Sequence, residues 1–248
     1  MKALFLTLIL ATPLLAQVST EVANSRSTVP AERTDKWAPS WKERHELLVK
    51  RANTNTKDYQ LVFVGDSITH SWERAGKKVW ANNFAKFGAL NLGIGGDRTE
   101  HVLWRLQNGA WPKDLKPKVA VVMIGTNNTG FEKGQPAEET AAGIQLIIDE
   151  IHQRSPETQI ILHAIFPRGA NPKDGKRVTN NKINTLISKL GERDYVHYAD
   201  IGNKFLDPKG QLPKVIMPDR LHPNARGYQI WATALKPELE KLGLKEKP

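Results

Sequence analysis

The chain has 248 residues, a length that fits one domain with a sizeable core. It contains no cysteine, which excludes disulfides and thiol chemistry, so any nucleophile must be a hydroxyl or a water. The formal net charge is +10, but the basic residues are scattered and form no arginine-rich stripe interleaved with aromatics. We therefore do not expect nucleic acid as a partner.

Residues 1–16 have the pattern of a signal peptide: one lysine precedes an apolar run from Ala3 to Ala11, and small residues offer a cleavage site near Ala16. A membrane anchor is the alternative, but the run is shorter than the roughly 20 residues that a spanning helix needs. We expect a secreted or periplasmic protein without stable membrane insertion. Residues 17–36 are polar and are predicted to form a flexible linker, so that the folded domain covers residues 37–248.

Within this domain, helical spacing and short apolar runs alternate along the chain. A first helix is expected over residues 41–52. Runs that are apolar on consecutive positions predict strands buried on both faces, at residues 60–65, 89–93, 119–124, 159–165 and 195–199. Helices are expected at residues 99–108, 136–153, 176–190 and 224–241. This alternation predicts an α/β fold, a three-layer α/β/α sandwich around a parallel sheet of five strands, in which reactive loops gather at the carboxyl ends of the strands.

Polar residues follow the first two strands at those ends. GDSITH ends the first strand. Either Ser67 exposes its hydroxyl at the rim of the sheet, or Asp66 or Ser67 caps the next helix. NLGIGGD follows the second strand, where backbone N–H groups of glycines can converge on a small anion, and Asp97 or Thr99 can cap the following helix. The glycine spacing differs from that of a dinucleotide-binding loop, which excludes a nucleotide.

The third strand and the last helix add three more candidates. IGTNN follows the third strand and places an asparagine amide where it can either donate to an oxyanion or form an Asx-turn. Asp219 and His222 lie three residues apart before the last helix, either as a structural histidine or as a base oriented by a carboxylate. Together with Ser67 these residues supply what acyl transfer needs. The seven histidines show no metal-ligand spacing, so we expect no metal.

These blocks together resemble the GDSL, or SGNH, hydrolase superfamily, and within it the branch of the intracellular platelet-activating-factor acetylhydrolase catalytic subunits and their secreted bacterial relatives. The resemblance runs from about Trp37 to Leu239 through GDSITH, NLGIGGDRTEHVLWRLQNG, KPKVAVVMIGTNN, FPRG and DRLHPNARGY. It implies a flavodoxin-like sheet of order 2-1-3-4-5. It also implies a role for each matched residue: nucleophile and oxyanion donor for Ser67, oxyanion donors for Gly96 and Asn127, and the Asp-His pair for Asp219 and His222.

The implied activity is that of a serine esterase that needs no cofactor. The chain has little room for a lid or a long acyl tunnel, which favours a small ester with a short acyl group such as acetyl, and export favours acetylated carbohydrate as its alcohol part. Arg98, Trp104 and Arg168 are candidates for substrate contact, although a core position for the tryptophan and surface ion pairs for the arginines fit equally. His70 is expected on a helix surface.

Two alternatives stay open at this point. A lysophospholipase or thioesterase of the same superfamily would keep every catalytic residue and change only the pocket. A secreted, non-catalytic carbohydrate-binding module on the same scaffold is the second. The relatives also form dimers, so a homodimer is an expectation that rests on the resemblance alone.

Overall fold

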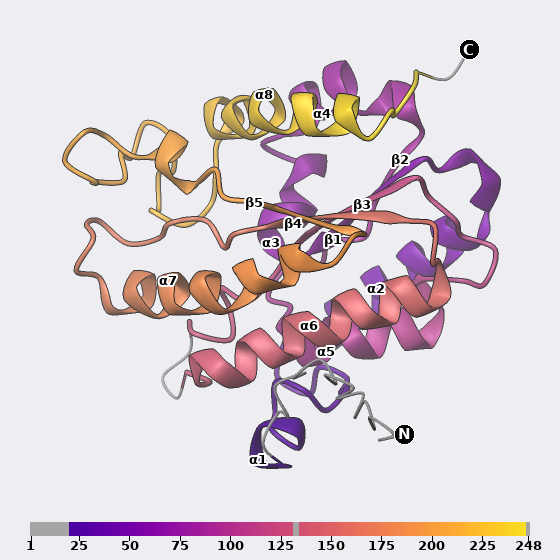
Figure 1. Ribbon diagram of the computed structural model, residues 1–248, viewed down its shortest axis with the longest axis horizontal. Coiled ribbons are helices and arrows are strands. Elements are labelled where there is room, and N and C mark those ends of the chain that lie inside the picture. The colour runs from indigo at the N-terminus through magenta and orange to yellow at the C-terminus, as the bar shows by residue number, and fades with distance from the viewer. Residues whose placement is uncertain (1–19, 131–133, 247–248) are drawn as a thin grey trace, which may run out of the picture.

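The computed structural model describes residues 20–130 and 134–246 (Figure 1). The signal peptide expected over residues 1–16 lies outside the described residues. The centre of the molecule is one sheet of five parallel strands in the order β2-β1-β3-β4-β5. The strands are β1 (Leu61–Gly65), β2 (Ala89–Asn91), β3 (Val119–Met123), β4 (Gln159–His163) and β5 (Val196–Ala199). Each lies where the sequence predicts a strand, and the order agrees with the one that the resemblance implies.

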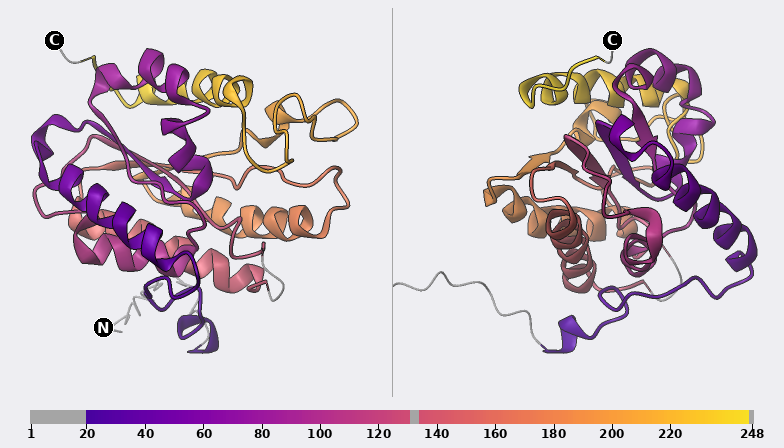
Figure 2. Two further views of the ribbon diagram at one scale, coloured as in Figure 1. Left: turned by 180° about the vertical axis from the view of Figure 1, so that it is seen from behind. Right: turned by 90° about the vertical axis from the view of Figure 1, so that its right-hand side faces the viewer.

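Helices cover both faces of the sheet, as Figures 1 and 2 show. One face is covered by α2 (Ala38–Asn53), α5 (Thr99–Arg105), α6 (Ala137–Arg154) and α7 (Gly175–Ile187), and the other by α4 (Lys77–Asn83) and α8 (Ala225–Lys241). Alternate side chains of β1 explain both layers, because Val62 and Val64 join one core cluster while Leu61 and Phe63 join the other. The predicted three-layer sandwich is confirmed.

Shorter helices complete the chain. The helical pattern predicts neither α4 nor the four-residue helix α3 (Ser67–His70), because neither is long enough to show a helical period. For α3, only the capping interpretation of GDSITH indicates a helix. The remaining elements are α1 (Thr20–Ala23), a π-helical turn at Leu106–Ala110 that continues α5, and 3₁₀ turns at Thr56–Asp58, Ser71–Glu73, Ala85–Phe87, Ser188–Glu192 and Gly202–Phe205.

The linker predicted over residues 17–36 is wrong for residues 25–35, which we call the N-terminal strap. Ser27 is fully buried: its hydroxyl donates to Oε1 of Gln135 over 2.8 Å, and its carbonyl accepts from the Thr99 hydroxyl over 2.7 Å. The backbone N–H of Ala31 donates to the carbonyl of Glu100 over 3.2 Å. The strap reads as a linker because its side chains are polar, but these polar groups find buried partners on α5 and on the segment before α6.

Candidate active site

Ser67 stands at the rim of the sheet because the chain turns sharply after β1. A Cβ at Gly65 would overlap the carbonyl oxygen of Met123 on β3, so the turn needs glycine. Asp66 then caps α3 by accepting the backbone N–H of Ile68 at 2.9 Å, and Ser67 is the first residue of that helix. The two interpretations of GDSITH are therefore both correct, since Asp66 is the cap and the Ser67 side chain is left half-buried at the rim.

His222 reaches Ser67 from the loop before α8. Its Nε2 lies 2.9 Å from the Ser67 hydroxyl, and its Nδ1 lies 2.6 Å from a carboxylate oxygen of Asp219. The second Asp219 oxygen accepts the backbone N–H groups of Leu221 and His222 at 3.0 and 2.8 Å. Arg220 adopts a left-handed conformation, with φ of +59°, which folds the loop tightly enough for these contacts. A bond from Nδ1–H to Asp219 leaves the Nε2 lone pair directed at the serine.

Asp219 is ionised in this arrangement. Partial burial raises the pKa of its carboxyl, but the hydrogen bonds from the His222 ring and from the backbone N–H groups outweigh burial, so that the pKa lies below its usual value. The carboxylate can therefore accept Nδ1–H at neutral pH and stabilise a positive charge on the ring. Its side chain is 55% exposed, which makes this pair more open to solvent than a buried triad.

Gly96 and Asn127 come from the loops after β2 and β3. Gly96 has a φ of +80° and lines the same cleft as Ser67. The Asn127 amide donates one hydrogen bond to the carbonyl of Asp97 over 2.9 Å, which fixes the side chain and leaves its second N–H for another acceptor. Asn128, by contrast, is buried and binds the backbone N–H and the hydroxyl of Thr99. The first asparagine is therefore available to a ligand, and the second holds the loop to α5.

Beneath the glycine loop lies a buried ion pair that the sequence did not indicate. Asp97, expected as a cap for α5, instead accepts from Nε1 of Trp41 at 2.6 Å and pairs with Arg105 at 2.6 Å, while Arg98 occupies the cap position. Burial raises the pKa of Asp97, and the guanidinium of Arg105 offsets part of that rise. Through Trp41 and Arg105, Asp97 links the glycine loop to both α2 and α5. Neither partner of Asp97 could be assigned without the fold.

A cleft of about 960 Å³ opens from Ser67 toward α2. Its inner end is formed by Ser67, His70 and Gly96, and its α2 wall carries Trp41 and, at the rim, Trp37, which is 57% exposed. His70 thus faces this cleft rather than an open helix surface. Burial and the neighbouring Arg44 lower the pKa of His70 to about 4, so its ring is neutral at pH 7.

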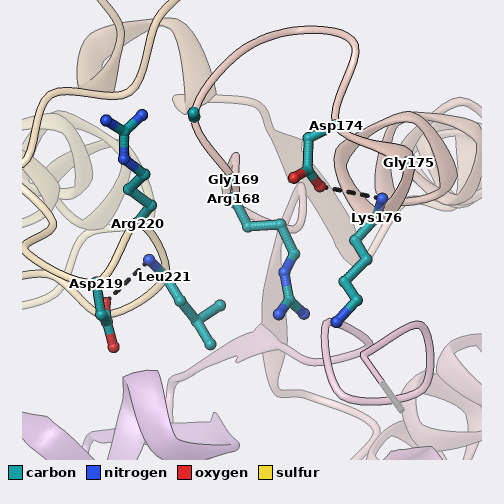
Figure 3. A pocket seen from close by; sticks show the side chains of 9 residues that line it. Arg168, Gly169, Asp174, Gly175, Lys176, Asp219, Arg220 and Leu221 are labelled. Carbon is teal, nitrogen blue, oxygen red and sulfur yellow. Dashed lines mark hydrogen bonds between the residues drawn. The ribbon is translucent and has the colours of Figure 1, made fainter. Parts of the chain in front are cut away.

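A second hollow of about 670 Å³ lies on the other side of Asp219 (Figure 3). Arg168 points into it, and its guanidinium donates to the carbonyl of Thr126 over 2.8 Å. The other two candidates for substrate contact lie elsewhere. Arg98 pairs with Glu100 in a hollow beside the strap, and Trp104 packs against Trp41 in the core. Arg168 is therefore the one of the three that flanks the Asp-His pair.

In residues 20–130 and 134–246, no group of three or more His, Cys, Asp or Glu side chains is placed to hold a metal ion. None of the helices in these ranges is long and apolar enough to cross a membrane.

The family comparison agrees with this geometry. The model of the GDSL-like lipase/acylhydrolase family matches residues 63–230. The chain belongs to this family. It is 34% identical over 203 residues to human platelet-activating factor acetylhydrolase IB subunit alpha1, covering 82% of this chain and 84% of that protein. The chain is therefore an ester hydrolase.

Two solved structures share the fold. A GDSL-like lipase from Bacteroides thetaiotaomicron superposes with a TM-score of 0.65 at 21% identity, covering 81% of this chain and 97% of that one. An acetylxylan esterase from Geobacillus stearothermophilus superposes with a TM-score of 0.59 at 21% identity, covering 75% and 94%. At this identity the likeness concerns the fold alone.

Proposed function

We propose that the chain is a secreted serine esterase that removes acetyl groups, with Ser67 as nucleophile, His222 as general base and Asp219 as the residue that orients the base. The observation that carries this proposal is the 2.9 Å distance between the Ser67 hydroxyl and Nε2 of His222, with Asp219 at Nδ1. This is the distance at which a base takes the proton of an attacking hydroxyl.

In the first half of the reaction, Ser67 attacks the ester carbonyl and His222 accepts its proton. The negative charge that forms on the carbonyl oxygen is stabilised by the backbone N–H groups of Ser67 and Gly96 and by the amide of Asn127. His222 then gives the proton to the leaving alcohol, which leaves an acetyl group on Ser67. In the second half, a water attacks this ester with His222 again as base, and acetate is released.

The cleft along α2 suits the alcohol part of an acetylated carbohydrate. It is open to solvent, charged and polar side chains lie among the apolar surface that lines it, and the exposed ring of Trp37 at its rim offers a flat surface for a sugar to stack on. An acetylxylan esterase shares this fold, so the fold itself is compatible with that substrate class. The apolar run near the start of the chain supports export, which would bring the enzyme to extracellular glycans.

The competing substrate is a phospholipid or thioester with a longer acyl chain. Two assays distinguish this substrate from an acetyl ester. The first compares hydrolysis of acetyl and decanoyl nitrophenyl esters, and the second measures release of acetate from acetylated xylan. We expect the acetyl ester to be cleaved with the higher kcat/KM and acetate to be released from the xylan. A preference for decanoate would support the lysophospholipase or thioesterase reading instead.

The catalytic assignment is tested with Ser67→Ala. We expect kcat to fall by about 10⁴-fold or more, because the nucleophile is removed, and labelling by a fluorophosphonate to disappear. Ser188→Ala is the matched control, since the Ser188 hydroxyl donates to the Thr185 carbonyl at the end of α7, on an element that does not carry the triad. Wild-type protein that is folded but neither labelled nor active would favour the non-catalytic binding module.

A further inference from the structure

Arg33, in the N-terminal strap, reaches the glycine loop of the candidate active site. Its side chain is only 7% exposed. One guanidinium nitrogen donates to the carbonyl of Gly95 over 3.0 Å, while Nε and the other terminal nitrogen donate to the two carboxylate oxygens of Asp35 at 2.8 and 3.0 Å. The guanidinium also borders the cleft that holds Ser67. Arg33 precedes the first residue of the family match by 30 positions, outside the matched region.

The carbonyl that Arg33 binds belongs to the same peptide unit as the N–H of Gly96. The described residues contain no cis peptide bond, so this unit is trans and its N–H points away from its C=O. A hydrogen bond that fixes the direction of the Gly95 carbonyl therefore fixes the opposite direction of the Gly96 N–H. The positive charge on the guanidinium also polarises the peptide, which strengthens its N–H as a donor.

This peptide needs such a restraint because glycine lies on both sides of it. A peptide between two glycines can rotate between orientations that side chains would exclude elsewhere, and Gly96 already has a φ of +80°. A Cβ at Gly96 would overlap the terminal nitrogen of Arg33, so the guanidinium fills the space in which another residue would carry its side chain. The conformation of the glycine loop is therefore fixed by a side chain of the strap and not by side chains of the loop itself.

The strap itself is held firmly enough to act in this way. Ser27 and Ala31 bind the first turn of α5, and Ser27 also binds Gln135 before α6. Asp35 takes the guanidinium in a two-point contact that sets its plane. The hydrogen bond from the Arg33 guanidinium, with that from the Trp37 backbone, outweighs partial burial and lowers the pKa of the Asp35 carboxyl. The carboxylate is therefore ionised at neutral pH and can hold the guanidinium.

We propose that Arg33 is a positioning residue for the oxyanion hole: by binding the Gly95 carbonyl, it holds the Gly95–Gly96 peptide with its N–H toward the oxyanion. This inference rests on the proposed esterase function and adds to it a part of the site that lies outside the family match. It explains why the segment before Trp37 packs against the domain.

The test measures acetyl ester hydrolysis by Arg33→Ala and Arg33→Lys. We expect Arg33→Ala to lower kcat by about 10- to 100-fold with KM changed less than about 3-fold, because the lost contact acts on the transition state. Arg33→Lys keeps a charged donor for the Gly95 carbonyl and should lose less than about 10-fold. Added guanidinium chloride at non-denaturing concentration should restore part of the kcat of Arg33→Ala.

Arg26→Ala is the matched control. Arg26 lies on the same strap and its side chain is 65% exposed, paired with Glu100 away from the cleft, so its loss should leave kcat and the guanidinium response unchanged. Thermal unfolding of each variant shows whether the fold is kept. If Arg33→Ala unfolds, the test uses Arg33→Lys and Arg33→Gln instead. A wild-type kcat for both of these variants would overturn the proposal.

The outcomes separate this inference from the proposed function. A Ser67→Ala variant that keeps full activity would remove the esterase mechanism and the inference with it. An inactive Ser67→Ala beside an Arg33→Ala with unchanged kcat would overturn only the role of Arg33. A rise in KM without loss of kcat would make Arg33 a substrate contact, and a loss of kcat that guanidinium does not restore would make its role structural; both results contradict the proposal.

Discussion

Asp66 is a buried carboxyl next to the proposed nucleophile, and it takes no part in the proposed reaction. One of its oxygens accepts the backbone N–H of Ile68, while the other is buried with no hydrogen-bond partner among the described residues. Burial raises the pKa of Asp66 to about 7, with Asp97 acting in the same direction and His222 and Arg168 against it. Asp66 therefore caps α3 with one carboxyl oxygen and leaves its other oxygen buried and unpaired.

This arrangement predicts the effect of Asp66→Asn on stability. Between about pH 4 and pH 7 the native state holds a proton on Asp66 that the unfolded state has lost, so the wild-type protein loses stability as the pH rises through this window. Asparagine can still accept from Ile68 and does not ionise. We expect the variant to be more stable than the wild type by on the order of 4 kcal/mol at pH 8 and by less than about 1 kcal/mol at pH 4, in urea unfolding. An equal difference at both pH values would contradict the raised pKa.

At the scale of elements, α6 approaches the strap through Gly143. A Cβ at this position would overlap the carbonyl oxygen of Ser27 and lie 2.6 Å from the hydroxyl of Thr99, two atoms that are hydrogen-bonded to each other. The close approach of helix, strap and α5 therefore depends on the absence of a side chain in the middle of α6.

The prediction is that Gly143→Ala destabilises the protein although alanine is the better helix former. The gain of about 1 kcal/mol in helix propensity is outweighed by overlap with the strap, so we expect a net loss of about 1 to 3 kcal/mol in urea unfolding. Gly175→Ala at the start of α7 is the control, because a Cβ there meets no atom within 4 Å and should leave stability equal or higher. A stabilised Gly143→Ala would mean that the strap is not held against α6.

The contrast between sheet and strap shows which elements a sequence can predict. The five strands were found because burial on both faces makes them apolar at consecutive positions, a pattern contained within each segment. The strap is ordered by partners far along the chain, such as Gln135 for Ser27 and Gly95 for Arg33, and nothing within its own polar sequence indicates them.

The same distinction holds for the site. Ser67, Asp219 and His222 are candidates from the sequence because each lies within a recognisable block, and the fold brings their side chains within hydrogen-bonding distance. Arg33 and the pair of Asp97 with Arg105 are defined by contacts between elements, so no block indicates them.

At the scale of the whole molecule, four histidine side chains have pKa values well below the usual value, so their rings are neutral in the native state at neutral pH. Burial lowers the pKa of His45, His70 and His163 to about 4 and that of His101 to about 3. The His163 ring shows how this is achieved. Its Nε2 accepts from the indole N–H of Trp231 at 3.0 Å, and its Nδ1–H can donate to the carbonyl of Ala199 at 3.2 Å, so that the neutral ring satisfies both nitrogens.

The histidines predict that the protein loses stability as the pH falls from about 6.5 toward 4. In this window the unfolded chain protonates its histidines and the native state does not, so acid favours unfolding. Asp66 holds a proton in the native state and opposes this, which leaves a net uptake of about two to three protons on unfolding near pH 5.5. The measurement is the free energy of unfolding in urea at steps between pH 7.5 and pH 5. The slope of this free energy against pH gives the number of protons taken up.

The same pH series on Asp66→Asn should have a slope that is larger by up to about one proton, because this variant no longer holds the opposing proton. Since the chain contains no cysteine and thus no disulfide, nothing covalent masks the transition. A slope near zero or of the opposite sign in this range would contradict the lowered pKa values of the four rings.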